Sequence, residues 1–149
     1  MTQWLVDISI GPIQHFVGQS RRTRDLWGSS YLLSFLCAHA AMAVVEEGTE
    51  LLQPDPANNR FCQLVCKQRA GEEIAEEVPA FASVPNHIVI RTTKDPEHVA
   101  DRARHALQQA WHRVAEAVWQ RFVEPWQELG NQTRAIWDRQ VDGFGSSCG

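Results

Sequence analysis

The spacing of apolar positions along the chain predicts three strands. From residue 3 to residue 10 every second side chain is apolar: Trp4, Val6, Ile8 and Ile10. A period of two is typical of a half-buried strand. Residues 87–93 are rich in β-branched side chains, which favours a second strand. A shorter one is expected at residues 50–53, where Pro54 ends it.

Apolar residues at helical spacing predict two long helices and a shorter one. The first helix is expected over residues 13–47, with Gly48 as its C-terminal cap. The second begins at Asp95-Pro96, an N-cap followed by proline at the first helical position, and ends or kinks at Pro125. Its expected buried stripe is Val99, Ala103, Ala106, Leu107, Ala110, Trp111, Val114, Val118 and Phe122.

The middle and the end of the chain carry weaker patterns. Residues 61–66 have the composition of a strand, and residues 67–80 are polar and acidic. We interpret about 55–83 as an exposed insert. A further helix is expected at about 131–142, and residues 143–149 form a loose tail.

This order of elements, β-α-β-(insert)-β-α, predicts an α+β fold. Two βα units around an antiparallel sheet suggest a ferredoxin-like, palm-type domain over residues 1–142. A palm of this kind would finish with one more strand, and the sequence ends just short of it. We therefore expect an open edge or an uncovered apolar face.

Composition narrows the classes of function. The chain has 149 residues, of which 44% are hydrophobic, so it can form a real core. Its net charge of −4 argues against a stand-alone, non-specific nucleic-acid binder. No apolar run reaches the ~18 residues of a membrane span, and no signal-peptide pattern is present. These features predict a cytoplasmic protein.

Gly11, Pro12 and Gln14 lie where the first strand meets the first helix. A glycine turn that leads into a helix N-terminus leaves backbone N–H groups without partners, and the helix dipole there attracts phosphate. The alternative is a tight turn that only joins the two elements, with glycine for its conformation and proline to start the helix. The residues alone favour this alternative.

Two further clusters follow in the same helix. Arg21, Arg22 and Arg24 form either a solvated face, with Arg21 and Asp25 paired four residues apart, or a surface for phosphate or a partner carboxylate. Small residues at Gly28-Ser29-Ser30 allow close approach of another backbone or of a flat ligand such as a nucleotide base.

The sequence offers no complete catalytic or metal constellation. Asp7 could hold a metal, but two-metal nucleotidyl chemistry needs a second carboxylate, and the chain has no Gly-Gly-Asp-Asp hairpin and no His-Asp pair. Cys62 and Cys66 lack a second pair for structural zinc. We expect no catalytic residue and no metal ligand in this chain.

Three segments resemble one family. Ile10-Gly-Pro-Ile-Gln-His-Phe16, Arg21-Arg-Thr-Arg-Asp-Leu-Trp27 and Ser30-Tyr-Leu-Leu-Ser34 are similar to the first palm domain of the large subunit of type III-B CRISPR effector complexes, the Cas-ten family in its Cmr-two form. Leu52-Gln-Pro54, Val84-Pro-Asn-His-Ile88 and Trp137-Asp-Arg-Gln-Val141 resemble later parts of the same domain. The family's Gly-Ser step reads Ser29-Ser30 here, and its cyclase motif, zinc region and nuclease domain have no counterpart in this sequence.

The resemblance implies a role in RNA-guided antiviral defence. In this family a pair of palms makes cyclic oligoadenylate from ATP, and the second palm supplies the carboxylates that hold Mg²⁺. The first palm completes the nucleotide pocket and scaffolds neighbouring subunits. We expect Gly11, Pro12, Gln14, Arg22 and Ser30 to contribute to ATP binding. The expected partners are the rest of the large subunit and other effector subunits, with guide and target RNA met indirectly and no membrane. The alternatives are a purely structural interaction domain and a stand-alone nucleotidyl cyclase.

Overall fold

The computed structural model describes residues 2–11, 17–18, 20–46, 48–75, 77–81, 83–126 and 132–145, with the backbone alone for 144 and 145. The chain divides into two compact units, Met1–Leu107 and Gln108–Gly149. The first unit contains the sheet and its helices, and the second is helical. Among the described residues, no helix combines the length and the apolar character that crossing a bilayer requires.

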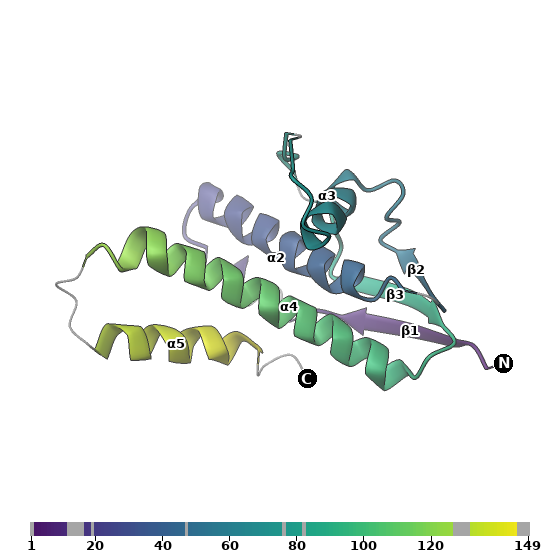
Figure 1. The fold of residues 1–149 in the computed structure, drawn as a ribbon. Helices are drawn as coiled ribbons and strands as arrows, with labels where there is room; N and C mark the ends of the chain where they lie inside the picture. The colour runs from purple at the N-terminus through teal and green to yellow at the C-terminus, as the bar shows by residue number, and fades with distance from the viewer. Residues whose placement is uncertain are drawn as a thin grey trace. The chain divides into compact units, whose positions relative to one another are not determined.

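Three strands form one antiparallel sheet, as predicted. They are β1 (Trp4–Ser9), β2 (Thr49–Gln53) and β3 (His87–Thr92), in the order β1-β3-β2 (Figure 1). Since β1 and β2 both run antiparallel to the strand between them, this is the split β-α-β arrangement of a ferredoxin-like fold. The structure is therefore α+β, and its described residues place no strand beside the outer edge of β1.

The two faces of the sheet differ in burial. Ile88, Ile90 and Thr92 of β3 are buried on one face, whereas His87 and Arg91 are exposed on the other. The period of two seen in the sequence thus separates a core face from a polar face. The polar face carries two cross-strand pairs, His87 with Asp7 and Arg91 with Glu50.

The first predicted helix is shorter than expected at both ends. Helix α2 spans Thr23–Ala43, although residues 17–18 are also helical and residues 12–16 lie outside the described residues. Its N-cap, Arg22, has an extended backbone that separates α2 from the preceding turn. At the other end Val44 is the C-cap, so the prediction that Gly48 caps the helix is wrong. Gly48, with a φ of +80°, lies in the turn into β2.

Residues 61–66 are helical, although their composition is that of a strand. Helix α3 spans Arg60–Arg69, and the side chain of Asn59 caps it by accepting a hydrogen bond from the Cys62 N–H at 3.0 Å. Phe61, Cys62, Leu64 and Val65 are buried, which is the spacing of one helical face. Helix α3 packs against α2 and so adds to the core of the first unit.

The second long helix, α4 (Pro96–Val118), begins where the sequence predicted. It continues as a π-helical turn, η1 (Trp119–Val123), and the helical backbone ends before Pro125. The stripe is buried at Val99, Ala103, Ala106, Leu107 and Ala110. Its last members were predicted wrongly, because Val118 and Phe122 are exposed.

The predicted third helix is present as α5 (Gln132–Gly145), which extends into the segment expected to be a tail. Within the second unit the indole Nε1 of Trp111 donates a hydrogen bond to the Val141 carbonyl at 2.9 Å, and this bond joins α4 to α5. The rings of Trp119 and Trp137 lie 5.7 Å apart, and the Arg134 guanidinium lies 4.8 Å from the Trp119 ring centroid.

Candidate functional site

The end of β1 is fixed to the start of β3 through Asn86. The buried Ile10 donates its N–H to the Asn86 carbonyl at 2.8 Å, and the Asn86 side-chain amide donates back to the Ile10 carbonyl at 3.4 Å. Gly11 follows directly and is exposed. These bonds hold the strand end that carries Gly11, while Pro12 and Gln14 lie outside the described residues.

Asn86 is a positioning residue that the sequence did not single out. It entered only as part of the Val84-Pro-Asn segment of the resemblance. An asparagine after a proline at the start of a strand signals a side chain that bonds nearby backbone groups. Its partner is 76 residues away in the sequence, so no local pattern identifies it.

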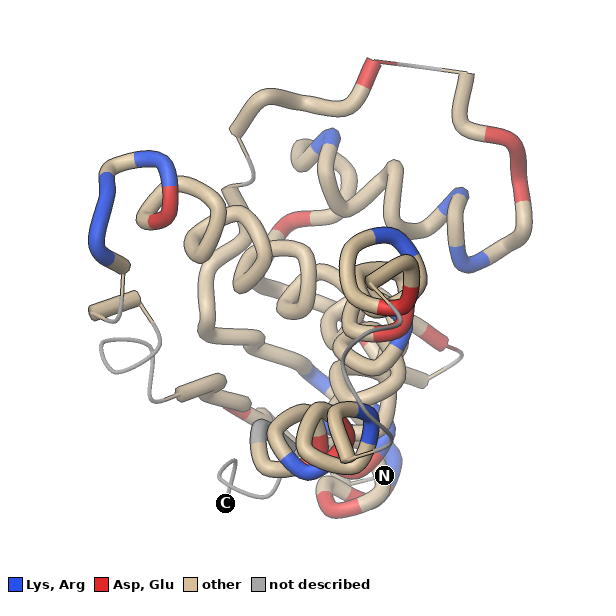
Figure 2. The backbone as a smooth tube through the Cα atoms, turned by 90° about the vertical axis from the view of Figure 1, so that its left-hand side faces the viewer, with Lys and Arg blue, Asp and Glu red and all other residues tan. Residues whose placement is uncertain are grey.

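The arginines at the beginning of α2 are exposed and carry unneutralised charge. Arg22 is the N-cap and makes no side-chain capping bond, and Arg21 precedes it. The expected Arg21–Asp25 pair is therefore wrong, because the two residues are not neighbours on one helix surface. In the part of the chain that the structure describes, Arg21, Arg22 and Arg24 form no ion pair. Figure 2 shows this basic group at the tip of the helix, with acidic colouring beside it.

Ser30 is exposed on α2, but the structure does not bring it to Arg22. Eight residues at 1.5 Å each separate the two by about 12 Å along the helix axis. Between them lies Gly28, where an added Cβ would meet no atom within 4 Å. The close-packing interpretation of Gly28 therefore finds no neighbour among the described residues, and the space beside it is open.

The neighbouring side chains of α2 are ordered by specific contacts. Ser29 Oγ donates to the Asp25 carbonyl at 2.8 Å and lies 3.1 Å from Ser20 Oγ, which holds the preceding turn against the helix. The Trp27 ring lies 5.3 Å from Tyr31, and Tyr31 packs edge-on against Phe61 at 5.5 Å. Trp27 remains half exposed, so a flat apolar surface adjoins the arginines.

Asp7 lies on the exposed face of the sheet, 3.3 Å from Nδ1 of His87. No group of three or more His, Cys, Asp or Glu side chains that could hold a metal occurs among the described residues. Of the thiols, burial raises the pKa of Cys37 to about 12 and that of Cys62 to about 11. Both are therefore poor nucleophiles at neutral pH.

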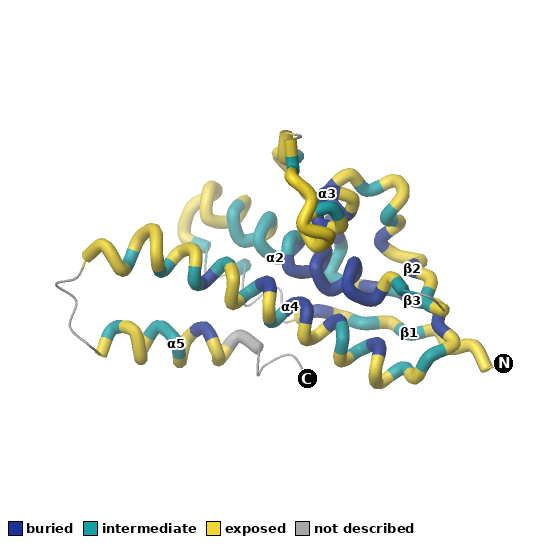
Figure 3. The backbone as a smooth tube through the Cα atoms, in the orientation of Figure 1, coloured by how far each residue is buried: buried dark blue, intermediate teal, exposed yellow. Residues whose placement is uncertain are grey.

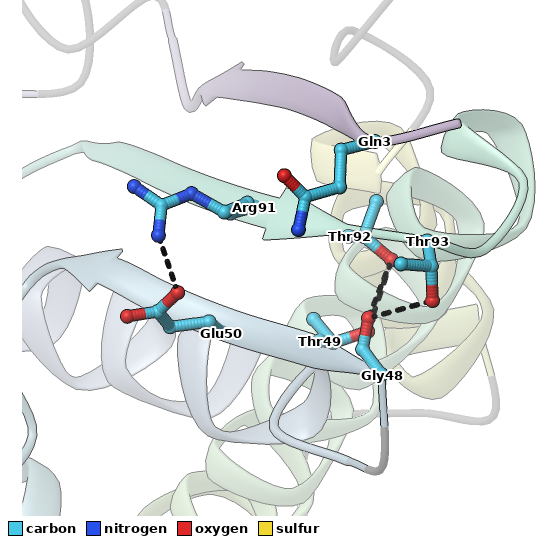
Figure 4. A pocket seen from close by; sticks show the side chains of 7 residues that line it. All are labelled: Gln3, Gly48, Thr49, Glu50, Arg91, Thr92 and Thr93. Atoms are coloured by element: carbon cyan, nitrogen blue, oxygen red, sulfur yellow. Dashed lines mark hydrogen bonds and ion pairs between the residues drawn. The ribbon is translucent and has the colours of Figure 1, made fainter. Parts of the chain in front are cut away.

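A recess of about 300 Å³ lies at the other end of the sheet. Figure 4 shows its lining: Gln3, Gly48, Thr49, Glu50, Arg91, Thr92 and Thr93. Arg91 donates to Glu50 at 2.8 Å, and Thr92 Oγ1 donates to the Gly48 carbonyl at 3.3 Å. Gln3 precedes β1 and Gly11 follows it, and none of the predicted site residues that the structure describes, Gly11, Arg22 and Ser30, lines the recess.

The fold defines a class of domain: a ferredoxin-like α+β unit in which Gly11, two residues after the first strand, precedes an arginine-rich helix start. The family model for the N-terminal region of the CRISPR-associated protein Cmr2 matches residues 5–116. The chain belongs to this family, which confirms the resemblance found in the sequence.

One relative is the CRISPR system Cmr subunit Cmr2 of Pyrococcus furiosus. It is 33% identical to this chain over 103 residues, which make up 67% of the chain and 11% of the relative. The chain therefore spans about a tenth of the length of the curated relative that it matches.

Proposed function

We propose that this chain acts as the non-catalytic first palm of a type III CRISPR large subunit. In this role it helps to form an ATP pocket for cyclic oligoadenylate synthesis and scaffolds the RNA-guided complex in antiviral defence. Membership of the Cmr2 N-terminal family supports the setting. The Mg²⁺ would be held mainly by a second palm outside this chain.

The strongest support for nucleotide binding is the end of β1. Asn86 fixes Ile10, so the exposed Gly11 leaves the sheet from a held position. A backbone without a Cβ at this point allows an oxygen of a phosphate group to approach N–H groups closely. Gly11, Pro12 and Gln14 would contact phosphate in this proposal.

The beginning of α2 fits the same ligand. Its arginines have no acidic partner among the described residues, so their charge is available to a triphosphate. The open space at Gly28 would admit a flat base, and Ser30 lies two residues further along the exposed half of the helix. Arg22 and Ser30 lie too far apart along the helix to touch one phosphate, and they would contact different parts of the nucleotide.

The second candidate is a purely structural domain. This candidate is favoured by the surface that the arginines share with two apolar side chains. Leu26 and Trp27, beside the arginines, are 46% and 50% exposed. An exposed surface of this composition is typical of protein interfaces. In that case the turn at Gly11 only joins strand to helix.

ATP titration of the complete two-palm assembly separates the two candidates. Gly11→Val should weaken ATP binding, since the added side chain blocks close backbone approach. Arg22→Ala and Ser30→Leu should weaken it as well, each by about 1–3 kcal/mol per lost contact. Arg104→Ala is the control, because Arg104 makes only an exposed pair with Asp101.

Circular dichroism of each variant confirms that it is folded before affinities are compared. Unchanged ATP affinity in a folded Gly11→Val assembly would contradict nucleotide binding at this turn. If Arg22→Ala instead released a subunit while ATP affinity stayed the same, the structural candidate would stand.

A further inference from the structure

One face at the beginning of α2 combines an aromatic ring, an open step and a cation. Arg24, Trp27, Gly28 and Tyr31 are spaced three, one and three residues apart, which places them on the same side of a helix. An added Cβ at Gly28 would meet no atom within 4 Å, so the helix surface is open there. Arg24 is exposed and lies one turn before Gly28, about 6 Å along the helix axis.

The ring of Trp27 is connected to the core through two other aromatic rings. Its centroid lies 5.3 Å from that of Tyr31 at an angle of 33°, and Tyr31 packs edge-on against the buried Phe61 at 5.5 Å. The Tyr31 hydroxyl also donates to the Pro79 carbonyl at 3.4 Å. Trp27 is nevertheless 50% exposed, so part of its indole surface faces solvent. A ring that is already held in this way loses little further freedom when a ligand stacks on it.

We propose that Trp27 stacks against the purine base of the bound nucleotide, in the open space at Gly28, and so determines a preference for purines. The assignment of Trp27 rests on the proposed ATP binding and adds the residue that selects the base. A purine has two fused rings and therefore covers more of an indole than a pyrimidine does. Arg24 forms no ion pair among the described residues, so its charge is available to the phosphates of the same nucleotide.

A partner protein fits this face less well than a base. Protein interfaces concentrate their binding energy in clustered aromatic and apolar side chains. Leu26 is the other exposed apolar side chain near the beginning of α2, but consecutive residues lie about 100° apart around a helix, so it does not share a face with Trp27. Beside the ring, this face offers the open step at Gly28 and the cation of Arg24, which fit a flat base and its phosphates.

The nucleotide selectivity of the complete two-palm assembly tests this proposal. ATP and CTP share the ribose and the triphosphate, so the ratio of their affinities reports on the base alone. Trp27→Ala should lower the affinity for ATP by about tenfold to a hundredfold and that for CTP by less, so the ratio falls toward one. Trp27→Phe should keep most of the preference for ATP, because a phenyl ring still stacks on a base.

Two further variants sharpen the test. Trp126→Ala is the matched control, because it removes a 71% exposed tryptophan from the second unit and should leave both affinities unchanged. Gly28→Leu places a side chain in the open space and should weaken ATP and CTP binding together. Leucine is a better helix former than glycine, so this variant should stay folded, and circular dichroism checks that it does.

The outcomes distinguish the role of Trp27 from the function on which it rests. If Gly11→Val weakens ATP binding while Trp27→Ala leaves the ATP-to-CTP ratio unchanged, the nucleotide site stands and the stacking is overturned. Equal affinities of the wild-type assembly for ATP and CTP would overturn it as well. Release of another subunit by Trp27→Ala, with both nucleotide affinities unchanged, would assign the ring to a protein partner instead. A wild-type assembly that binds neither nucleotide would overturn the stacking and the proposed function together.

Discussion

The two halves of α2 have opposite environments within one continuous helix. Residues 23–30 at its beginning are largely exposed, whereas the residues from Leu36 to Ala43 are buried (Figure 3). The buried half consists mainly of small residues and contacts β3 and α3 through the core of the first unit. The exposed half carries Arg24, Trp27 and Ser30, and Arg21 and Arg22 come directly before it.

The two halves of α2 therefore have different expected roles, one in stability and one in recognition. The residues of the buried half pack in the core, so replacing them is expected to affect folding. The exposed half and the two residues before it have few contacts in the described structure, so packing gives no reason for the three arginines, the glycine and the tryptophan of residues 21–28. A helix start that is held by its other half can present side chains to a ligand or a partner at little cost to the fold.

The largest difference in stability between the two halves is expected when one leucine is truncated in each. Leu36 is fully buried, so Leu36→Ala should lower the free energy of unfolding by about 2–5 kcal/mol. Leu26 is 46% exposed, so Leu26→Ala should change it by no more than about 0.5 kcal/mol. Urea titration of both variants measures the contrast. Equal losses would mean that the exposed half is also part of the core.

The buried half ends at a contact with α4 that should be the next most sensitive. Arg102 donates to the Ala43 carbonyl at 2.8 Å and also to the Glu46 carboxylate. Arg102→Ala leaves the helix end and a partly buried carboxylate without these bonds, at a cost of about 1–3 kcal/mol. Arg104→Ala, which breaks only an exposed pair, is the matched control and should cost less than about 1 kcal/mol.

The same contact gives the stability a dependence on pH. The hydrogen bond from Arg102, helped by Lys94, lowers the pKa of Glu46. A carboxyl with a lowered folded-state pKa stabilises the fold above its unfolded pKa of about 4.3, and this stabilisation is lost as the pH falls through the folded value. Arg102→Ala should flatten that acid limb in unfolding curves from pH 6 to pH 2, roughly the range in which a carboxyl titrates. An unchanged limb would exclude Glu46 as its source.

A substitution at Gly28, in the exposed half, should stabilise the protein. An added Cβ meets no atom within 4 Å, and alanine is a better helix former than glycine by about 1 kcal/mol. Gly28→Ala should therefore raise the free energy of unfolding by up to that amount. A loss of ATP affinity in the same stabilised variant would assign the open space to the ligand. Destabilisation would mean that something packs there.

The smallest effect on folding is expected from the arginines. Arg24 makes no ion pair among the described residues, so Arg24→Ala should change the free energy of unfolding by less than about 0.5 kcal/mol. Thermal unfolding measures this directly. A larger loss would show that the arginines belong to the scaffold and would weaken the contrast between the halves.

The sequence predicted the parts of the fold that follow from local periodicity. Strands β1 and β3 alternate clearly, and Asp95-Pro96 is a strong helix start. The segment at residues 61–66 was misread because its phenylalanine, valine and cysteines are common in strands. The better signal was Asn59, a helix N-cap two residues before Phe61. The break before α2 depends on the backbone of Arg22, which no apolar pattern reveals.

For the candidate site, the sequence predicted which residues take part but not the contacts that hold them in place. The sequence pointed to Gly11 and the arginines, and their part in a binding site stays a prediction. It did not reveal that Asn86 fixes Ile10 or that Arg102 caps α2, because each contact joins segments more than fifty residues apart. It also placed Arg22 inside a helix, whereas the structure places it at the cap.

The paired indoles of the second unit have a consequence for spectroscopy. Trp119 and Trp137 lie 5.7 Å apart at an angle of 56°, close enough for their electronic transitions to couple. Four of the six tryptophans belong to this unit, namely Trp111, Trp119, Trp126 and Trp137. Tryptophan fluorescence will therefore report mainly on the helical hairpin of α4 and α5. A denaturation curve recorded by that signal would weight the hairpin over the sheet, to which only Trp4 of β1 contributes, and a backbone probe such as amide infrared absorption would follow the sheet more directly.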